Sequence, residues 1–497
     1  MSVAAGPLLF TFDNTFVRRL EGLYEPWRGA PVERPVLLAL SGGVAADLEV
    51  DVEALRTPEG TAVLAGSVAP AGAEPVAMAY AGHQFGGWSP RLGDGRALLL
   101  GEVVDRRGVR QDLHLKGSGR TPFARGGDGK AAVGPMLREF AMGEAMHALG
   151  IPTTRALAVV ATNEIVTREV PLPGAVLTRV AESHLRVGTF EYVAASHDPE
   201  LLRRLADYAI ERHYPAALEA PNPYAAFYEQ VIAAQAELMV RWLLVGFVHG
   251  VMNTDNMAIS GQTIDYGPCA FMDGYDERTV FSSIDRQGRY AYGQQPAIAH
   301  WNLGRLGDAL LPLLDPDQQT AIEIAEAALN GFGPQFQRLL AVGLGTKLGL
   351  RVGAEELAEV HLLTGELLAL LQEHGPDFTF TFRALSASLR GDSAALRSVV
   401  AEPSAFDAWL AAWRELLHAQ GVEPAAAADA MDRVNPIYIP RNHLVEAALA
   451  AATGGDLAPF RTMLEVLGAP FTPRPGFEAW AQPAPEPDPG YQTFCGT

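Results

Sequence analysis

The spacing of apolar residues predicts a strand-rich first part of the chain. Residues 97–105 and 109–117 flank a short Arg-Arg-Gly turn and have the pattern of a β-hairpin. Three more apolar runs, at 156–162, 165–169 and 175–181, predict three further strands. Asn-Glu separates the first two of these runs, and Pro-Leu-Pro-Gly separates the last two.

Helical spacing dominates the remainder of the chain. One helix is expected among the strands at 135–150, with Pro135 at its start and Gly150 at its end, the places where helices favour these residues. Beyond about residue 191, apolar residues recur every three or four positions. The helices expected there are 198–214, 223–250, 319–332, 353–375, 403–421 and 441–455.

The strand-like and helical patterns of apolar residues together predict an α+β protein in three parts. Residues 1–190 form a strand-rich part, residues 191–345 a helical part, and residues 346–497 a helical extension that ends in a Pro- and Gly-rich tail. A ligand cleft is expected between the first two parts, because ligands commonly bind where two units meet.

Composition narrows the classes of function. The 497 residues are 48% hydrophobic and 19% charged, which is typical of a globular chain with an ample core. A net charge of -20 argues against nucleic acid as the main partner. No signal peptide or apolar run long enough for a membrane span is apparent, and there are only two cysteines, so we expect a cytoplasmic protein that does not bind membranes.

The segment HGVMNTDNMAISGQTIDYG, residues 249–267, has the outline of a phosphotransferase metal site. Asn256 and Asp265 offer the hard oxygen ligands that Mg²⁺ or Mn²⁺ prefers, and Asp255 is free to orient or deprotonate an acceptor. A hairpin over 257–265 would bring its two ends together. Val251, however, stands where many kinases place their catalytic aspartate. The alternative is a surface loop with an Asx turn.

Cationic residues elsewhere fit a phosphate-binding role. Lys116 ends a predicted strand, with His114 on the same face, and Glu139 lies early in the helix expected at 135–150. A strand lysine paired with a helix carboxylate positions phosphates in protein kinases, although two solvated charges are the simpler reading. Arg179 lies in an apolar predicted strand, and Arg186 follows this strand. Each requires an anionic partner, either a phosphate or a carboxylate of the same chain.

Other motifs carry less information. The glycine-rich segments 92–103 and 117–130 offer backbone amides near strand ends, but neither matches a Walker or dinucleotide fingerprint. His83, in the stretch GHQFGGW, is expected to be structural. Cys269 and Cys495 are either two unrelated thiols or a reversible tether that holds the tail near the site.

Long segments of the chain resemble the SelO family (selenoprotein O, also called YdiU), protein adenylyltransferases on a kinase-like fold. The resemblance extends from about residue 75 to residue 450. It includes VLTRVAESHLRVGTFE and NPIYIPRNHLVEAAL, and its other segments are 78–102, 113–157 and 249–273. Runs of this length are far more specific than any single motif.

The resemblance implies a two-lobed, protein-kinase-like fold with a strand-rich N-lobe, a helical C-lobe and a helical extension. It also implies transfer of AMP from ATP to Ser, Thr or Tyr hydroxyls of proteins, with ATP flipped so that its α-phosphorus faces the acceptor. Asp255 would be the base, Asn256 and Asp265 would hold Mg²⁺ or Mn²⁺, and Asp265 would also contact ATP. Lys116 would contact phosphate, with Glu139 as its partner. The other ATP-binding residues would be Gly93, Gly95, Arg96, Asp128, Gly129, Arg179 and Arg186.

The resemblance also pairs Cys269 with Cys495, because some family members carry selenocysteine near the C-terminus. Two alternatives remain open at this point. A conventional kinase would move the γ-phosphate and release ADP, and a pseudokinase scaffold would bind nucleotide without turnover. The presence of Asp255, Asn256 and Asp265 argues against a pure scaffold.

Overall fold

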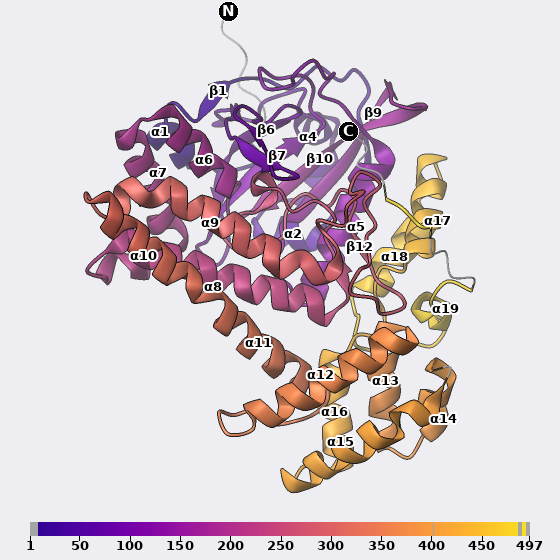
Figure 1. Ribbon diagram of the computed structural model, residues 1–497. Helices are drawn as coiled ribbons and strands as arrows, with labels where there is room; N and C mark the ends of the chain where they lie inside the picture. Colours follow the sequence, from indigo (N-terminus) through magenta and orange to yellow (C-terminus); the bar gives the residue numbers. More distant parts are fainter. Residues whose placement is uncertain (1–7, 401, 486–489, 494–497) are drawn as a thin grey trace, which may run out of the picture.

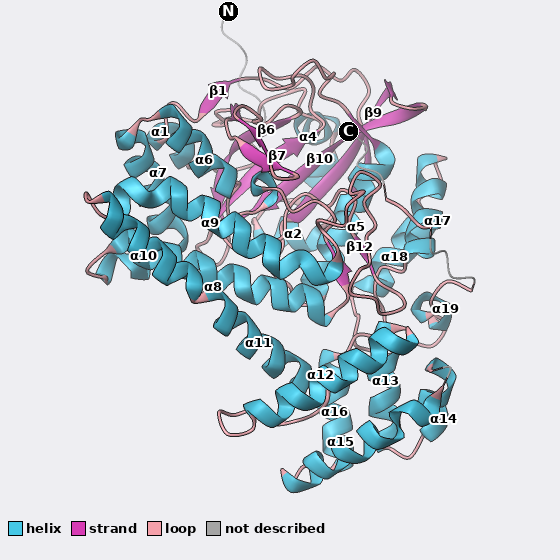
Figure 2. Cartoon of the chain, viewed as in Figure 1, coloured by secondary structure: helices cyan, strands magenta, loops and turns pink. Residues whose placement is uncertain are grey.

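An antiparallel sheet and the helices around it build the protein, and they confirm the predicted α+β class (Figures 1 and 2). The computed structural model describes residues 8–400, 402–485 and 490–493. Eight strands form the main sheet in the order β1-β3-β6-β7-β10-β9-β2, with β8 pairing β10. Their bounds are β1 Tyr24–Pro26, β2 Val36–Leu40, β3 Val76–Met78, β6 Ala97–Val104, β7 Arg110–Lys116, β8 Ala131–Ala132, β9 Arg155–Thr167 and β10 Pro171–Ala181.

The hairpin expected over 97–117 is present as β6 and β7. Its alternation is the predicted one: Leu113 and Leu115 are fully buried in an apolar layer, whereas His114 and Lys116 line a cleft on the opposite face. Two small sheets stand apart from the main one. They are β4 Gly82–Gln84 with β5 Gly87–Ser89, and β11 Phe247–Val248 with β12 Ala270–Phe271.

The prediction of three strands over 156–181 was wrong, because β9 runs without a break through Asn163 and Glu164. Asn163 has φ 55°, a left-handed conformation that asparagine tolerates better than most residues. The pairing of β9 with β10 shifts between Pro173 and Ala175, opposite this point. A β-bulge therefore accommodates Asn163 and Glu164, the polar residues that had suggested a turn.

Helices cover both faces of the sheet. Short helices α2–α4 contribute to the layer that contains Leu113 and Leu115. On the opposite face α5 packs against β9 and β10, beginning two residues before the predicted start and ending at Ala148. The helices up to this point are α1 Thr15–Arg19, α2 Gly42–Asp47, α3 Val52–Arg56, α4 Pro58–Leu64 and α5 Val133–Ala148.

The later helices form the rest of the core. Residues of α6–α11 belong to the same continuous apolar cluster as those of α5. Their bounds are α6 Val187–Ser196, α7 Pro199–His213, α8 Pro223–Leu244, α9 Gln295–Leu314, α10 Gln318–Asn330 and α11 Phe332–Lys347. The strand pair β11–β12 follows α8 and frames the 249–267 segment.

The C-terminal helices extend away from the sheet and then return to it (Figure 1). Helices α17 and α18 pack on α5, where the Phe140 and Phe460 rings lie 6.3 Å apart. In the described part of the tail expected over the last 30 residues there is one short helix, α19. The bounds are α12 Leu357–His374, α13 Phe378–Leu389, α14 Ser393–Val399, α15 Asp407–Ala419, α16 Pro424–Val434, α17 Asn442–Thr453, α18 Ala458–Leu467 and α19 Glu478–Ala481. In the described residues, no helix has the length and apolar character needed to cross a membrane.

Candidate active site

One cleft of about 1050 Å³, on the α5 side of the sheet, collects the candidate residues. Its walls come from β7, β10, α5, the glycine-rich segments and the 251–268 loop. Among the residues that line it are Gly93, Gly95, Arg96, Lys116, Asp128, Gly129, Glu139, Arg179, Arg186, Asp255, Asn256 and Asp265. The structure therefore brings together the candidate ATP-binding, metal-binding and catalytic residues of the sequence analysis, whereas Cys269 lies outside the lining of the cleft.

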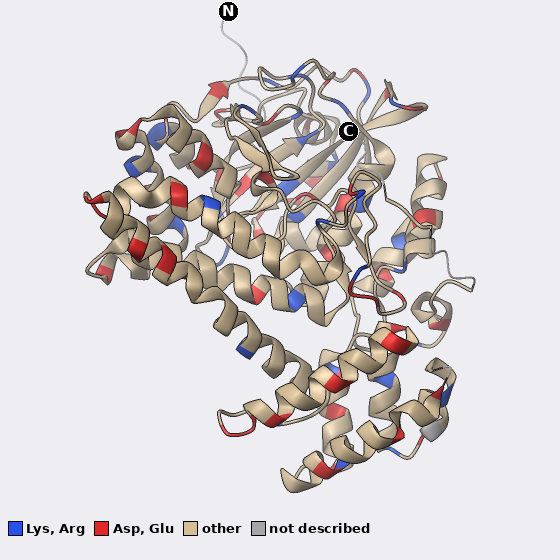
Figure 3. Cartoon of the chain, viewed as in Figure 1, with Lys and Arg blue, Asp and Glu red and all other residues tan. Residues whose placement is uncertain are grey.

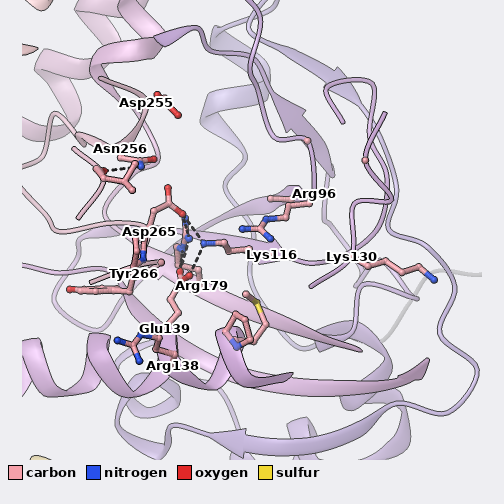
Figure 4. Close-up of a pocket in the computed structure, with 18 of the residues that line it drawn as sticks. Arg96, Lys116, Lys130, Arg138, Glu139, Arg179, Asp255, Asn256, Asp265 and Tyr266 are labelled. Atoms are coloured by element: carbon pink, nitrogen blue, oxygen red, sulfur yellow. Dashed lines mark hydrogen bonds and ion pairs between the residues drawn. The ribbon is translucent and has the colours of Figure 1, made fainter. Parts of the chain in front are cut away.

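Two carboxylates and three cations form a buried centre in this cleft, and Figure 4 shows four of the five, Lys116, Glu139, Arg179 and Asp265. Lys116 Nζ lies 2.6 Å from Glu139 and 2.9 Å from Asp265, and Arg179 Nη2 lies 2.5 Å from each of the same carboxylates. Arg186 Nη1 lies 2.9 Å from the other oxygen of Asp265. Burial alone would raise the pKa of Asp265, but the surrounding cations hold this pKa well below its usual range.

The sheet explains why these charges meet. Strands β7 and β10 are neighbours in register, so Arg179 lies beside His114 and on the same face as Lys116. Helix α5 crosses this face and presents Glu139 between the two cations. Arg179 consequently has carboxylates of its own chain as partners. The sequence analysis had left this alternative open beside a phosphate.

Asp265 is held in an unusual backbone conformation, with φ 64°. The hairpin predicted before it, over 257–265, was wrong: Ala258 bridges to Arg186 and Thr263 bridges to Thr153, so the two halves pair with other segments. Gly261, at the turn, lies against Ala234 of α8, where a Cβ would approach to 2.9 Å. Pairing with distant segments, and not a local hairpin, therefore fixes the backbone that leads to Asp265.

Asp255 lies in a short 3₁₀ turn, Thr254–Asn256, and is only 7% exposed. Gln84 Nε2 donates to Oδ2 at 3.2 Å, whereas Oδ1 has no hydrogen-bond partner among the described residues. The backbone carbonyl of Asp255 accepts from Arg186 at 2.7 Å. Burial raises the pKa of Asp255 to about 6, a value suited to a base that works near neutral pH.

Asn256 and Asp265 are the residues available to hold a metal ion. The Asn256 amide nitrogen donates to the Val251 carbonyl at 3.0 Å, which fixes the amide by its nitrogen and leaves its oxygen as a ligand. Among the residues described, no group of three or more His, Cys, Asp or Glu side chains is arranged around a possible ion. Two oxygens fit Mg²⁺ or Mn²⁺ only if phosphate and water supply the other ligands, as is usual for Mg²⁺.

The glycine-rich segments form the outer wall of the cleft. Gly93 has φ 68° and packs on Phe123, and a Cβ at Gly95 would lie 2.9 Å from the Phe123 carbonyl. Asp128 is partnered by Arg168 at 2.9 Å. These close approaches need glycine, which is consistent with backbone that lies near a bound ligand.

Two residues of the site were missed by sequence reasoning. Gln84 contacts Asp255, and the Arg186 guanidinium lies 4.5 Å from the centre of the Tyr80 ring. For Gln84 the signal was the density of glycines and aromatics in GHQFGGW, residues 82–88, but nothing local indicated which residue Gln84 would contact. His83 Nδ1 lies 2.6 Å from Glu191 and so has a partner outside the centre.

The tail reaches the edge of the cleft. Thr493 donates through its hydroxyl to the carbonyl of Pro268 at 2.7 Å and pairs with Ser282. Cys269, next to Pro268, is fully buried, and burial raises the pKa of its thiol to about 11. Cys495 lies outside the described residues, so its predicted pairing with Cys269 stays a prediction.

Comparisons with known proteins agree with this site. The sequence profile of the family described as "Protein adenylyltransferase SelO" matches residues 8–468. The "Protein nucleotidyltransferase YdiU" of Cereibacter sphaeroides is 59% identical over 496 residues, covering 99% of this chain and 100% of the relative. A protein of the same name from Pseudarthrobacter chlorophenolicus is 56% identical, with 99% and 100% covered.

Fold and site together define an α+β protein with a cation–carboxylate centre beside a buried candidate base. The extent of the profile match and the identity of the relatives then settle the family. The chain belongs to the SelO family, as the sequence resemblance indicated.

Proposed function

We propose that this protein is an adenylyltransferase that moves AMP from ATP to Ser, Thr or Tyr hydroxyls of proteins and releases pyrophosphate. The observation that carries the proposal is the placement of Asp255. Asp255 lines the same cleft as the three cations around Asp265, and its Oδ1 has no hydrogen-bond partner among the described residues. The names of the SelO family and of its YdiU relatives support this activity.

ATP binds in this proposal with its α-phosphorus toward Asp255, flipped relative to an ordinary kinase. Lys116, Arg179 and Arg186 contact the phosphates and stabilise the charge that pyrophosphate gains as it leaves. Gly93, Gly95, Arg96, Asp128 and Gly129 line the nucleotide. Val251 is buried and apolar, so a base in the kinase position is absent and Asp255 takes that role.

The chemistry requires few other groups. Asp255 accepts the proton of the acceptor hydroxyl on its carboxylate, which Gln84 holds through Oδ2. Asn256 and Asp265 would hold Mg²⁺ or Mn²⁺, which supplies charge neutralisation on the phosphates when bound. Glu139 keeps Lys116 in place. Positioning and electrostatics supply most of the rate, as in other phosphate transfers.

The fold that accompanies this function is proposed to be kinase-like and two-lobed. Residues 1–190 would form the nucleotide-binding lobe, residues 191–345 the helical lobe, and residues 346–497 the extension. Lys116 of strand β7 pairs with Glu139 of helix α5. Protein kinases use such a pair of a strand lysine and a helix carboxylate, which supports this interpretation.

Intact mass spectrometry after incubation with ATP and Mg²⁺ or Mn²⁺ under reducing conditions tests the activity, with casein as added acceptor. We expect a gain of one AMP unit, about 329 Da by chemical formula, on the enzyme or the acceptor. Asp255→Ala should abolish the gain and retain ATP binding. A gain of about 80 Da would indicate a kinase instead. ATP binding with no gain under any condition would indicate a scaffold.

A further inference from the structure

The β4–β5 hairpin lies directly over the loop that carries the candidate base. Its backbone donates twice to this loop: His83 N to Thr254 Oγ1 at 2.7 Å, and Phe85 N to Asn253 Oδ1 at 3.0 Å. A Cβ on Gly82 would approach Asp255 Oδ1 to 2.6 Å. The hairpin is therefore joined to the base at close range.

The outer surface of this hairpin is apolar and exposed. Phe85 is 38% exposed and Trp88 is 43% exposed, and Ile284 of a neighbouring loop is 55% exposed. Phe85 and Ile284 both line the cleft that contains Asp255. An apolar rim at the mouth of a site typically marks where a partner binds.

A cation completes the rim. Arg289 packs against Gly86 and lies 5.0 Å from the centre of the Trp301 ring. It forms no ion pair with any residue that the structure describes, and Arg286 beside it is exposed. The loop that carries both arginines is fixed to the hairpin, because Tyr290 Oη accepts from Phe85 N at 3.1 Å.

We propose that this rim, formed by Phe85, Trp88, Ile284 and Arg289, is the docking surface for the acceptor protein. It receives an extended segment with an aliphatic or aromatic side chain and a carboxylate within a few residues of the accepting hydroxyl. The apolar side chain contacts Phe85 and Ile284, and the carboxylate pairs with Arg289. Continuity with the cleft supports the assignment, since a hydroxyl that reaches Asp255 brings its flanking residues over the rim. The proposal rests on the proposed function and adds the recognition of the acceptor.

The test is a degenerate peptide library with one fixed central threonine, incubated with full-length protein, ATP and Mn²⁺. AMP-bearing peptides are sequenced by mass spectrometry. Wild type should enrich Leu, Ile or Phe together with Asp or Glu within three positions of the threonine. Arg289→Glu should reverse the charge preference, with about a tenfold change in the ratio of acidic to basic peptides. Ile284→Ser should raise the KM of an enriched peptide about fivefold.

Controls keep the outcome interpretable. Leu362→Ala and Arg414→Glu alter exposed residues of α12 and α15 and should leave the peptide preference unchanged. The ATP dissociation constant, measured for each variant, separates acceptor binding from nucleotide binding. AMP transfer that shows no sequence preference, or a preference that Arg289→Glu leaves intact, would overturn the docking surface while the proposed function stands. So would self-adenylylation without modification of any peptide. AMP on neither protein nor peptide would overturn the proposed function, and the surface with it.

Discussion

Replacing Glu139 by glutamine removes one of the two carboxylates that hold three buried cations together. Glutamine keeps the length of the side chain but loses its charge, and its amide can present a donor where Lys116 and Arg179 need an acceptor. Within the described part of the chain, Asp265 would then be the one carboxylate left in ion pairs with Lys116, Arg179 and Arg186.

The magnitude follows from burial. The side chains of Glu139 and Arg179 are 4% and 1% exposed. Removing one partner of a buried ion pair costs about 3–5 kcal/mol, because it leaves charge in a poorly solvated place. Burial raises the pKa of Glu139, but Arg179 and Lys116 outweigh this and lower it. A depressed carboxyl pKa contributes stability above the pKa of the unfolded state, so the loss is fully expressed at pH 7.

Glu144→Gln is the matched control. Glu144 lies on the same helix and pairs with Arg155 at 2.5 Å, but its side chain is 22% exposed. This pair is bidentate but more exposed than the Glu139–Arg179 pair, so its loss should cost less than the loss of a fully buried pair. We expect urea unfolding at pH 7 to show a much lower midpoint for Glu139→Gln than for Glu144→Gln. AMP transfer should also fall at least a hundredfold in Glu139→Gln only, since Lys116 loses its position.

Equal midpoints for the two variants would refute the reasoning, because they would show that the centre does not depend on Glu139. Urea unfolding in the presence of saturating ATP and Mg²⁺ gives a second test. Phosphates would supply anions to the unpaired cations, so nucleotide should raise the midpoint of Glu139→Gln more than that of wild type. A smaller rise would place the phosphates elsewhere in the cleft.

Three further predictions concern stability, backbone and redox state. Burial, together with nearby cations, holds the pKa of His184 well below its ordinary value, so the unfolded chain takes up the proton first. His184 alone should lower the stability by about 1.4 kcal/mol for each pH unit below 6.5, and His184→Asn should reduce the slope in unfolding experiments by this amount. Gly188→Ala would place a Cβ against a backbone carbonyl and 3.3 Å from the Cα of Asp255, so kcat should fall more than tenfold with the fold retained by circular dichroism. Cys495→Ser should make activity insensitive to oxidation if Cys495 tethers to Cys269. Unchanged redox sensitivity in the variant would exclude the tether.

The parts of the site that sequence predicted are those set by local periodicity. Lys116 could be placed on a cleft-facing strand because Leu113 and Leu115 alternate with it. Glu139 followed from its place early in a helix with clear ends. That these two residues meet depends on how α5 crosses the sheet, and one sequence does not specify that crossing.

The parts that sequence missed are set by contacts between distant segments. Thr263 pairs with Thr153 and Ala258 with Arg186, so the segment before Asp265 is not the hairpin that its own residues suggest. Gln84 reaches Asp255 across 171 positions of the chain. These contacts leave no local pattern, because each depends on how distant segments of the chain pack together.

The distribution of charge connects the acidic chain with the proposed phosphate chemistry. Asp and Glu lie mostly on the helices and loops (Figure 3), and their excess over Lys and Arg, 58 against 38, gives the net charge of -20. The cations Lys116, Arg179 and Arg186 are nearly buried inside the cleft, where an extended polyanion has no access to them. A ligand small enough to enter meets several positive groups at once, at a site where water screens them poorly. The surface charge therefore disfavours nucleic acid while the cleft favours a mononucleotide, and in the docking proposal the acceptor pairs with Arg289 at the rim.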